Sequence, residues 1–131
     1  MIVDSSALLA VLFEEPGFEK YADAISRVKP VRISAAGYLE VCIVADGRRN
    51  PRLSRRVDDL VATPQATIEP VTERQARIAR EAYRDYGRGS GHPARLNFGD
   101  CFAYALARDL GEPLLFKGDD FRHTDVKPAI A

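Results

Sequence analysis

Short apolar runs alternate with longer amphipathic stretches along most of the chain, and this alternation constrains the fold more than any other feature. The strand candidates are Ile2-Val3, Val31-Arg32-Ile33, Thr67-Ile68 and Leu114-Leu115-Phe116, with residues 125–130 (DVKPAI) as a candidate edge strand. Helical stretches of roughly ten to sixteen residues separate them. This order is typical of βαβ units, which build a parallel sheet covered by helices on both faces. We therefore expect an α/β fold with a central parallel sheet of four to five strands.

The length and charge of the chain fit one domain over residues 1–131. The chain has 131 residues, of which 46% are hydrophobic, enough for one sizeable core. Lys and Arg number 19 and Asp and Glu number 19, so net charge by itself indicates neither a nucleic-acid nor a membrane partner. No run approaches the roughly eighteen apolar residues that cross a bilayer, so we expect a cytosolic protein. Cys42 and Cys101 lack metal-ligand spacing and are expected to be buried free thiols.

Two segments predict amphipathic helices. Residues 72–86 place arginines opposite an apolar arc formed by Ala76, Ile78, Ala79, Ala82, Tyr83 and Tyr86. Glu73, Glu81 and Asp85 stand among those arginines, so a self-paired, solvated face is as good an interpretation as an RNA-binding one. The second helix follows the break at residues 14–17 and carries an apolar stripe from Phe18 to Val28.

Acidic residues stand at the ends of apolar segments, where unpaired charge is costly. Asp4 directly follows the first strand candidate, and Asp119-Asp120 follow the last one. Asp100 opens an apolar helix, and Glu40 is the only charged residue of residues 33–45, a segment apolar enough to be a helix buried nearly all round. Because the carboxyl ends of parallel strands meet at one edge of the sheet, we expect these acids to converge in a crevice there.

Converging carboxylates repel one another unless some are protonated or a cation neutralises them. Oxygen ligands without His or Cys favour Mg²⁺ or Mn²⁺ over Zn²⁺. Simpler interpretations stay open for each acid. Asp4 and Asp100 suit helix caps, Asp119-Asp120 suit a turn, and a distant Arg could pair with Glu40.

Four segments, MIVDSSALLAVLFEEP, ISAAGYLEV, HPARLNFGDCFAYALA and PLLFKGDDFRHTDV, follow one another over most of the chain. In this order they resemble the PIN-domain endoribonucleases, and among them the VapC toxins of bacterial toxin–antitoxin pairs. The resemblance implies a single PIN domain over residues 1–131, folded as a three-layer α/β/α sandwich. The family's catalytic acids correspond to Asp4, Glu40 and Asp100, and the fourth corresponds to Asp119 or Asp120. Asp125 also matches the family pattern and is expected to lie further out.

The resemblance implies an endoribonuclease toxin that depends on Mg²⁺, with Mn²⁺ as a substitute, and hydrolyses phosphodiester bonds in a tRNA or rRNA. Asp4 and Asp100 would hold the metal ion, which would polarise the scissile phosphate and activate water. Glu40 and the Asp119-Asp120 pair would orient that water or hold a second ion. The family also implies a homodimer in the bacterial cytoplasm, neutralised by a small cognate antitoxin encoded alongside.

Two further sets of residues are candidate contacts. Arg88, Arg95 and Lys117 lie near the expected pocket and are candidate contacts for the RNA backbone. The candidate antitoxin-binding residues are apolar and belong to the second amphipathic helix or shortly precede it: Leu12, Phe13, Phe18, Tyr21 and Ile25. The alternative is that these side chains simply form core.

Other functions remain in competition. An aspartyl-nucleophile phosphatase requires an Asp two positions after the first, where this chain has Ser6. A receiver domain requires an Asp after a middle strand, and TIEPVTE supplies none. A third alternative is a catalytically weak domain that binds RNA or a partner and keeps a vestigial acidic pocket.

Overall fold

The computed structural model describes residues 1–62 and 66–131. Within these residues four strands form one parallel sheet in the order β3-β2-β1-β4. They are β1 (Ile2–Val3), β2 (Val31–Ser34), β3 (Ala66–Glu69) and β4 (Leu114–Leu115). Ile2 lies opposite Arg32 of β2 and Leu114 of β4, and β2 pairs with β3 from Val31↔Ala66 to Ser34↔Glu69. The predicted strands and their parallel arrangement are confirmed.

The candidate edge strand at residues 125–130 forms only an isolated bridge beside β4, between Leu114 and Pro128. The amide of Leu114 donates to the Lys127 carbonyl at 2.8 Å, and the amide of Ala129 donates to the Leu114 carbonyl at 2.8 Å. Pro128 has no N–H and so cannot extend the ladder. The described sheet therefore has four strands, the lower of the two expected numbers.

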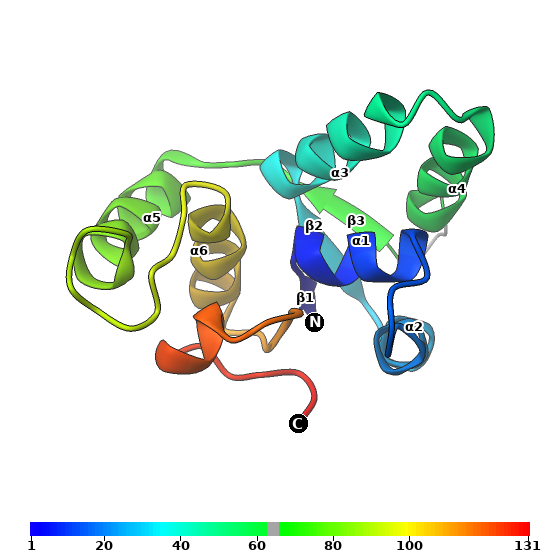
Figure 1. Cartoon of the computed structure of the whole chain (residues 1–131). Coiled ribbons are helices and arrows are strands. Elements are labelled where there is room, and N and C mark those ends of the chain that lie inside the picture. The colour runs from blue at the N-terminus through cyan, green and yellow to red at the C-terminus, as the bar shows by residue number, and fades with distance from the viewer. Residues whose placement is uncertain (63–65) are drawn as a thin grey trace.

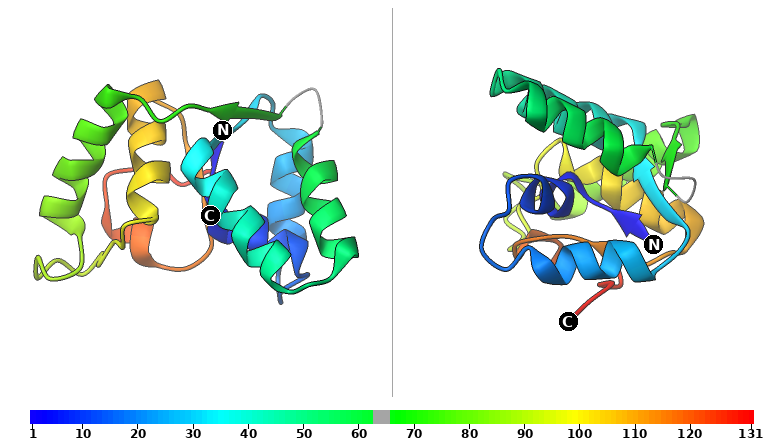
Figure 2. Two further views of the ribbon diagram at one scale, coloured as in Figure 1. Left: turned by 90° about the horizontal axis from the view of Figure 1, so that it is seen from above. Right: turned by 90° about the vertical axis from the view of Figure 1, so that its right-hand side faces the viewer.

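Helices cover both faces of the sheet (Figure 1). One face carries α1 (Ser5–Leu12), α2 (Glu19–Arg27), α3 (Ala35–Gly47) and α4 (Pro51–Val61), and the other carries α5 (Glu73–Tyr86) and α6 (Asp100–Leu110). A short 3-10 helix, η1, spans Asp120–His123 after β4. Figure 2 shows the sheet between the two groups of helices from two further directions. The result is the expected three-layer α/β/α arrangement.

Strands β1 and β4 are apolar and buried at every position because both of their faces are covered. Met1, Val3 and Leu115 pack into the core beneath α1–α4, whereas Ile2 and Leu114 pack against α5 and α6. Successive side chains of a strand point to opposite faces, so a doubly covered strand needs an apolar residue at each position. The continuous apolar runs of the sequence follow from this arrangement.

Local sequence signals set several helix boundaries. The Thr72 side chain accepts from the Gln75 amide at 3.1 Å and caps α5. Asn50 caps α4, with Pro51 at its first position, where a missing N–H costs nothing. Gly111 ends α6 in the left-handed conformation at φ 65°.

The expectation that residues 33–45 form a helix buried nearly all round is wrong. The segment does form most of α3, but only Val41 and Ala45 are fully buried on that helix. Leu39 is 57% exposed and Ile43 is 62% exposed. One face of α3 packs against the core, and another apolar face is exposed to solvent. The sequence did not reveal this asymmetry, because Glu40 is the only charged residue of the segment and one charge does not mark an outer face.

The apolar stripe around α2 divides between core and surface. Leu12 and Tyr21 are only 2% and 5% exposed and belong to the core, which excludes them as a partner surface in this structure. Phe13 and Ile25 are half-buried and pack against that core, and Phe18 is also half-buried. The alternative interpretation, that these residues are core, is therefore correct for Leu12 and Tyr21.

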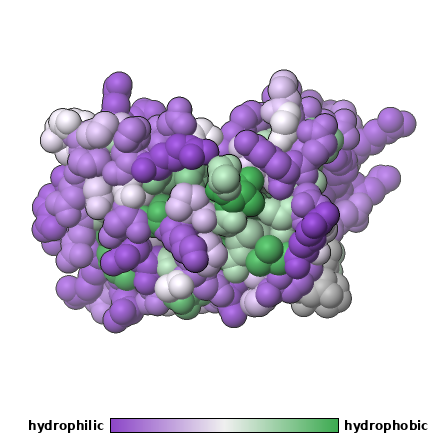
Figure 3. Space-filling view, turned by 90° about the horizontal axis from the view of Figure 1, so that it is seen from below, coloured by the Kyte–Doolittle hydropathy of each residue, from purple (hydrophilic) through white to green (hydrophobic). Residues whose placement is uncertain are grey.

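The outer surface is mainly hydrophilic. Hydrophobic side chains nevertheless gather near the centre of the face seen from below, and hydrophilic ones surround them (Figure 3). Of the helices in the described residues, none is long and apolar enough to span a bilayer. Cys101 is buried and Cys42 is half-buried, and both are free thiols, as expected.

Burial of Leu12 leads to a stability prediction. Leu12→Ala should lower the free energy of unfolding by about 2–5 kcal/mol, because it leaves a cavity in the core. Val28→Ala, at a side chain 43% exposed, should change it by less than about 0.5 kcal/mol. Urea denaturation measures both values. Equal effects of the two changes would contradict the core position of Leu12.

Candidate active site

Asp4 is a buried carboxylate at the carboxyl end of β1. It is 4% exposed and caps α1, where one of its oxygens, Oδ2, accepts from the Ser6 amide at 3.0 Å and from the Ser6 hydroxyl. The capping interpretation of Asp4 is therefore correct, but capping does not neutralise the charge. Burial raises the pKa of Asp4 to about 6, the Ser6 hydrogen bonds oppose the rise, and the charges of Asp100 and Glu40 add to it.

Asp100 begins α6 and is held by a reciprocal pair of hydrogen bonds with Asn97. The Asn97 amide donates to Oδ2 of Asp100 at 3.0 Å, and the Asp100 amide donates to Oδ1 of Asn97 at 2.8 Å. Two reciprocal side chain–backbone hydrogen bonds of this kind resemble a capping box. Partial burial raises the pKa of Asp100, the Asn97 amide opposes the rise, and the charges of Asp120 and Glu40 add to it. Asp100, Asp4, Glu40 and Asp120 thus lie close enough to repel one another.

Glu40 reaches the pocket from α3, although its residue is exposed. A Cβ placed on Gly99 would come within 2.8 Å of Oε2 of Glu40, so the carboxylate lies directly against the turn that precedes Asp100. The glycine at position 99 leaves room for that contact. Glu40 therefore lies near Asp100, although the two residues come from different helices.

The two adjacent aspartates after β4 have different surroundings. The charge of Asp120 helps to raise the pKa of Asp100. Asp119 instead pairs with Arg122 at 3.4 Å, and its side chain is 86% exposed. Geometry therefore favours Asp120 over Asp119 as the fourth acid of the pocket.

The sequence reasoning missed three polar residues that line or support this edge. Ser6 and Asn97 hold the two aspartates, and each could have been found from its spacing to an acid. Ser34 ends β2, is 2% exposed, and its hydroxyl has no hydrogen-bond partner within the described residues. In the register that pairs Ile2 with Arg32, Ser34 is level with Asp4 on the neighbouring strand. A buried hydroxyl without a partner is unusual, and Ser34 offers an oxygen to a bound group beside Asp4.

The donor set fits a divalent cation. Among the described residues, no basic side chain forms an ion pair with Asp4 or Asp100, and the hydrogen bonds of each carboxylate engage only Oδ2. Oδ1 of each carboxylate is left for a cation. No three His, Cys, Asp or Glu side chains of residues 1–62 and 66–131 converge tightly enough to hold a metal ion together. Mg²⁺ suits such an open site, because it commonly takes one or two carboxylates and keeps its remaining positions for water and phosphate.

Arg88 and Lys117 place positive charge near the acids. Arg88 is exposed. Its positive charge lowers the pKa of Asp100 and so opposes the effects of burial and of the neighbouring carboxylates. The Lys117 amide donates to the Ser6 hydroxyl at 3.0 Å, and its ammonium pairs with Glu15. Arg95 is exposed, at φ 51°.

Asp125 contacts α6 beyond its first turn. Its carboxylate accepts from the Tyr104 hydroxyl at 2.7 Å and pairs with Arg108 at 3.5 Å. Both partners belong to α6. Asp125 therefore ties the C-terminal segment to that helix.

Sequence comparisons match nearly the whole chain. The PIN-domain family model matches residues 1–127. Ribonuclease VapC28 of Mycobacterium tuberculosis is 57% identical over 130 residues, which cover 99% of this chain and 98% of that protein. Ribonuclease VapC42 of the same species is 52% identical over 129 residues, which cover 98% of each.

Solved structures share the fold at low sequence identity. The crystal structure of Mycobacterium tuberculosis VapC20, described as a sarcin-ricin loop cleaving toxin, gives a TM-score of 0.73 at 19% identity and covers 97% of this chain and 98% of that one. FitAcB from Neisseria gonorrhoeae gives 0.70 at 17% identity, covering 97% of this chain and 94% of that one.

Burial of Asp4 predicts a stability that depends on pH. Because its pKa is raised in the folded state, protonation favours folding, and this stabilisation is lost as the pH rises through about 6. Asp4→Asn keeps the cap without the charge. Without divalent cations it should stabilise the fold by about 2 kcal/mol more at pH 7 than at pH 4. Denaturant melts at both pH values measure the gain.

The matched control is Asp119→Asn, which removes an exposed, ion-paired carboxylate. It should give no comparable gain at pH 7. A gain for Asp4→Asn that is the same at pH 4 and pH 7 would contradict the buried-charge argument.

Proposed function

Because the chain belongs to the PIN-domain family, and within it to the VapC proteins, we propose that it is the ribonuclease toxin of a toxin–antitoxin pair. We propose further that it is a Mg²⁺-dependent endoribonuclease that hydrolyses phosphodiester bonds in a tRNA or rRNA. The observation that carries this proposal is the pair of anchored aspartates, Asp4 and Asp100, each with a free oxygen at one sheet edge.

Asp4 and Asp100 would hold the cation through Oδ1, with Mn²⁺ able to replace Mg²⁺. When bound, the cation supplies positive charge for the scissile phosphate and makes water a better nucleophile. Ser6 and Asn97 keep the two carboxylates in place by holding Oδ2. Their hydrogen bonds fix the direction of the free oxygens before RNA arrives.

Glu40 and Asp120 would act on the water rather than as primary metal ligands. Both are exposed at the mouth of the pocket, where an attacking water can enter. A carboxylate there can accept a proton from that water and orient it towards phosphorus. Since water and not the ribose hydroxyl attacks, the products carry 5′-phosphate and 3′-hydroxyl ends.

Arg88, Arg95 and Lys117 would bind the RNA backbone beside the acids. An acidic pocket repels phosphates, so cations on the rim are needed to hold the substrate. All three residues are exposed, which suits contact with RNA. We place this activity in the bacterial cytoplasm, where such RNA is present.

The acids give a direct test. Asp4→Asn, Glu40→Gln, Asp100→Asn and Asp120→Asn should each lower the rate of RNA cleavage in Mg²⁺ at least about a hundredfold, because each removes a ligand or a proton acceptor. Cleavage of labelled RNA measures the rates, and thermal melts show that each variant is folded.

Asp119→Asn is the matched control and should keep most of the activity, since Asp119 is paired with Arg122. Excess EDTA should abolish cleavage, and Mg²⁺ or Mn²⁺ should restore it. Full activity of Asp100→Asn, or cleavage in excess EDTA, would rule out the metal-dependent mechanism. RNA binding without cleavage by the unaltered chain would favour the vestigial-pocket alternative.

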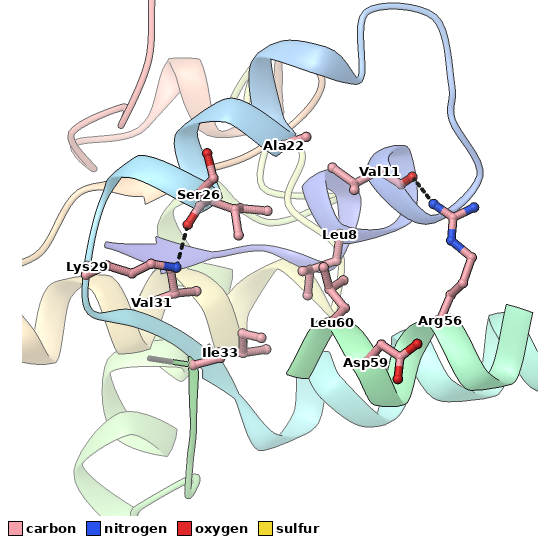
Figure 4. A pocket seen from close by; sticks show the side chains of 12 residues that line it. Leu8, Val11, Ala22, Ser26, Lys29, Val31, Ile33, Arg56, Asp59 and Leu60 are labelled. Atoms are coloured by element: carbon pink, nitrogen blue, oxygen red, sulfur yellow. Dashed lines mark hydrogen bonds between the residues drawn. The ribbon is translucent and has the colours of Figure 1, made fainter. Parts of the chain in front are cut away.

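An apolar groove supports the proposal of an antitoxin partner. A cavity of about 690 Å³ lies between α1, α2, α4 and the strands β2 and β3 (Figure 4). Leu8 and Val11 of α1, Ile25 of α2 and Leu60 of α4 line its apolar walls, and Lys29, Arg56 and Asp59 supply charge. Apolar walls with charges of both signs suit an amphipathic helix that inserts its apolar face.

Of the apolar residues selected from the sequence, Ile25 lines this groove. Ile25→Asp should therefore weaken binding of the cognate antitoxin more than about tenfold, or roughly 1.4 kcal/mol, while RNA cleavage persists. Val28→Asp is the control, because Val28 is 43% exposed and does not line the groove. Isothermal titration of each folded variant measures the affinity, and normal binding by Ile25→Asp would remove the groove from the proposal.

We also propose a homodimer, for which the outer face of α3 offers an apolar surface. Leu39 and Ile43 are four residues apart on this helix, and both are more than half exposed. Ile43→Arg should shift the mass seen by light scattering from two 14.5 kDa chains to one. A monomer of the unaltered chain at micromolar concentration would contradict the dimer.

A further inference from the structure

Phe98 is an exposed aromatic side chain beside the acidic pocket. Its side chain is 77% exposed, the highest value among the exposed large hydrophobic residues of the described chain. Its ring meets the edge of the Phe102 ring at a centroid distance of 4.9 Å and an interplanar angle of 87°. Phe102 thus supports the Phe98 ring from one side, and much of that ring remains open to solvent.

A cavity of about 260 Å³ opens next to this ring, between α5 and α6. Tyr83 and Phe102 join Phe98 in lining it, and the small residues Ala76 and Ala79 leave it space. Tyr83 belongs to the predicted apolar arc of its helix, yet it is 44% exposed and does not join the core. This volume is several times that of a water molecule, enough to admit a flat ring.

The charge that lines this cavity is positive. Arg80 is the only charged residue that lines it, no carboxylate lines it, and Arg80 forms no ion pair within the described residues. Other arginines of α5 are paired: Arg74 with Asp109, Arg77 with Glu73 and Arg84 with Asp85. An unpaired guanidinium beside aromatic rings suits a ligand that is both aromatic and anionic.

The cavity lies next to the segment that carries Asp100. Phe98 stands between Asn97, which holds Asp100, and Gly99, which lies against the Glu40 carboxylate. Asp100 follows Phe98 by two positions, so their Cα atoms are within about 7.6 Å. A nucleotide whose base stacks on Phe98 is therefore close enough for a neighbouring nucleotide to reach Asp100.

We propose that this cavity binds an unpaired nucleobase of the RNA substrate, stacked on Phe98, with an adjacent phosphate held by Arg80. The inference rests on the proposed ribonuclease function and adds a structural requirement to its substrate. Proteins that read single-stranded RNA stack its bases on aromatic side chains and bind its phosphates with arginine. A base inside a duplex cannot occupy the site, so cleavage is directed to loops and single strands.

The chain contains no tryptophan, which makes Phe98→Trp a single fluorescent reporter at the site. In a chain that also carries Asp100→Asn, a single-stranded oligoribonucleotide of about ten nucleotides should quench this fluorescence to saturation. The same strand annealed to its complement should not quench it. Leu110→Trp is the matched control, because Leu110 is 42% exposed at the C-terminal end of α6, the helix that Phe98 precedes, and its signal should stay constant.

A second measurement uses affinity. Phe98→Ala should weaken binding of the single strand at least about tenfold, and Phe98→Trp should restore it. Arg80→Gln should also weaken binding and should reduce its dependence on salt. Leu110→Ala should leave the affinity unchanged. Thermal melts establish that all variants are folded.

The outcomes distinguish failure of the base-binding site from failure of the proposed ribonuclease function. If the unaltered chain cleaves RNA but the Phe98→Trp reporter is not quenched, or Phe98→Ala binds with full affinity, the base site alone is overturned. Quenching by single strands without any cleavage overturns the ribonuclease function and supports base binding. A change of mass in Phe98→Ala by light scattering would show that a second copy of the chain covers Phe98, and it overturns the proposal.

Discussion

Repulsion among carboxylates at one edge of the sheet is the constraint on which the rest of the structure depends. Asp4 is almost fully buried and its pKa is raised to about 6, so its charge opposes folding. Two helices begin at this edge and offset part of that cost. The Ser6 amide of α1 donates to Asp4, and α6 begins at Asp100, so the positive ends of both helix dipoles lie at this edge. The parallel sheet makes the arrangement possible, since its strands all end at the same edge.

The two helical layers carry surfaces of different chemistry. On the side of α1, α2 and α4, aliphatic residues and charges of both signs line a groove suited to a protein helix. On the side of α5 and α6, aromatic rings and Arg80 line a smaller cavity suited to a base and its phosphate. Figure 2 shows these two groups of helices on opposite sides of the sheet. The proposed antitoxin helix and the proposed RNA base would therefore occupy separate surfaces.

Sequence patterns were most informative where local chemistry decides the structure. The strand Ile2–Val3 and the helix Glu73–Tyr86 follow from apolar runs and from helical periodicity. The position of Asp4 after a strand also predicted its place at the sheet edge. The pattern failed for α3, whose apolar residues Leu39 and Ile43 are exposed. An apolar sequence predicts that a helix face is buried, but it does not predict whether the same chain or another molecule buries it.

The sequence by itself determined the order of the strands and helices and the identity of the acids, because both depend on residue type and on near neighbours. Only the tertiary structure distinguished Asp120 from Asp119, buried Tyr21 and left Phe98 exposed. It also brought Ser34 level with Asp4, although two helices separate them along the chain. These outcomes depend on which segments meet across the sheet and between the helices, and such contacts form between residues that no local pattern links.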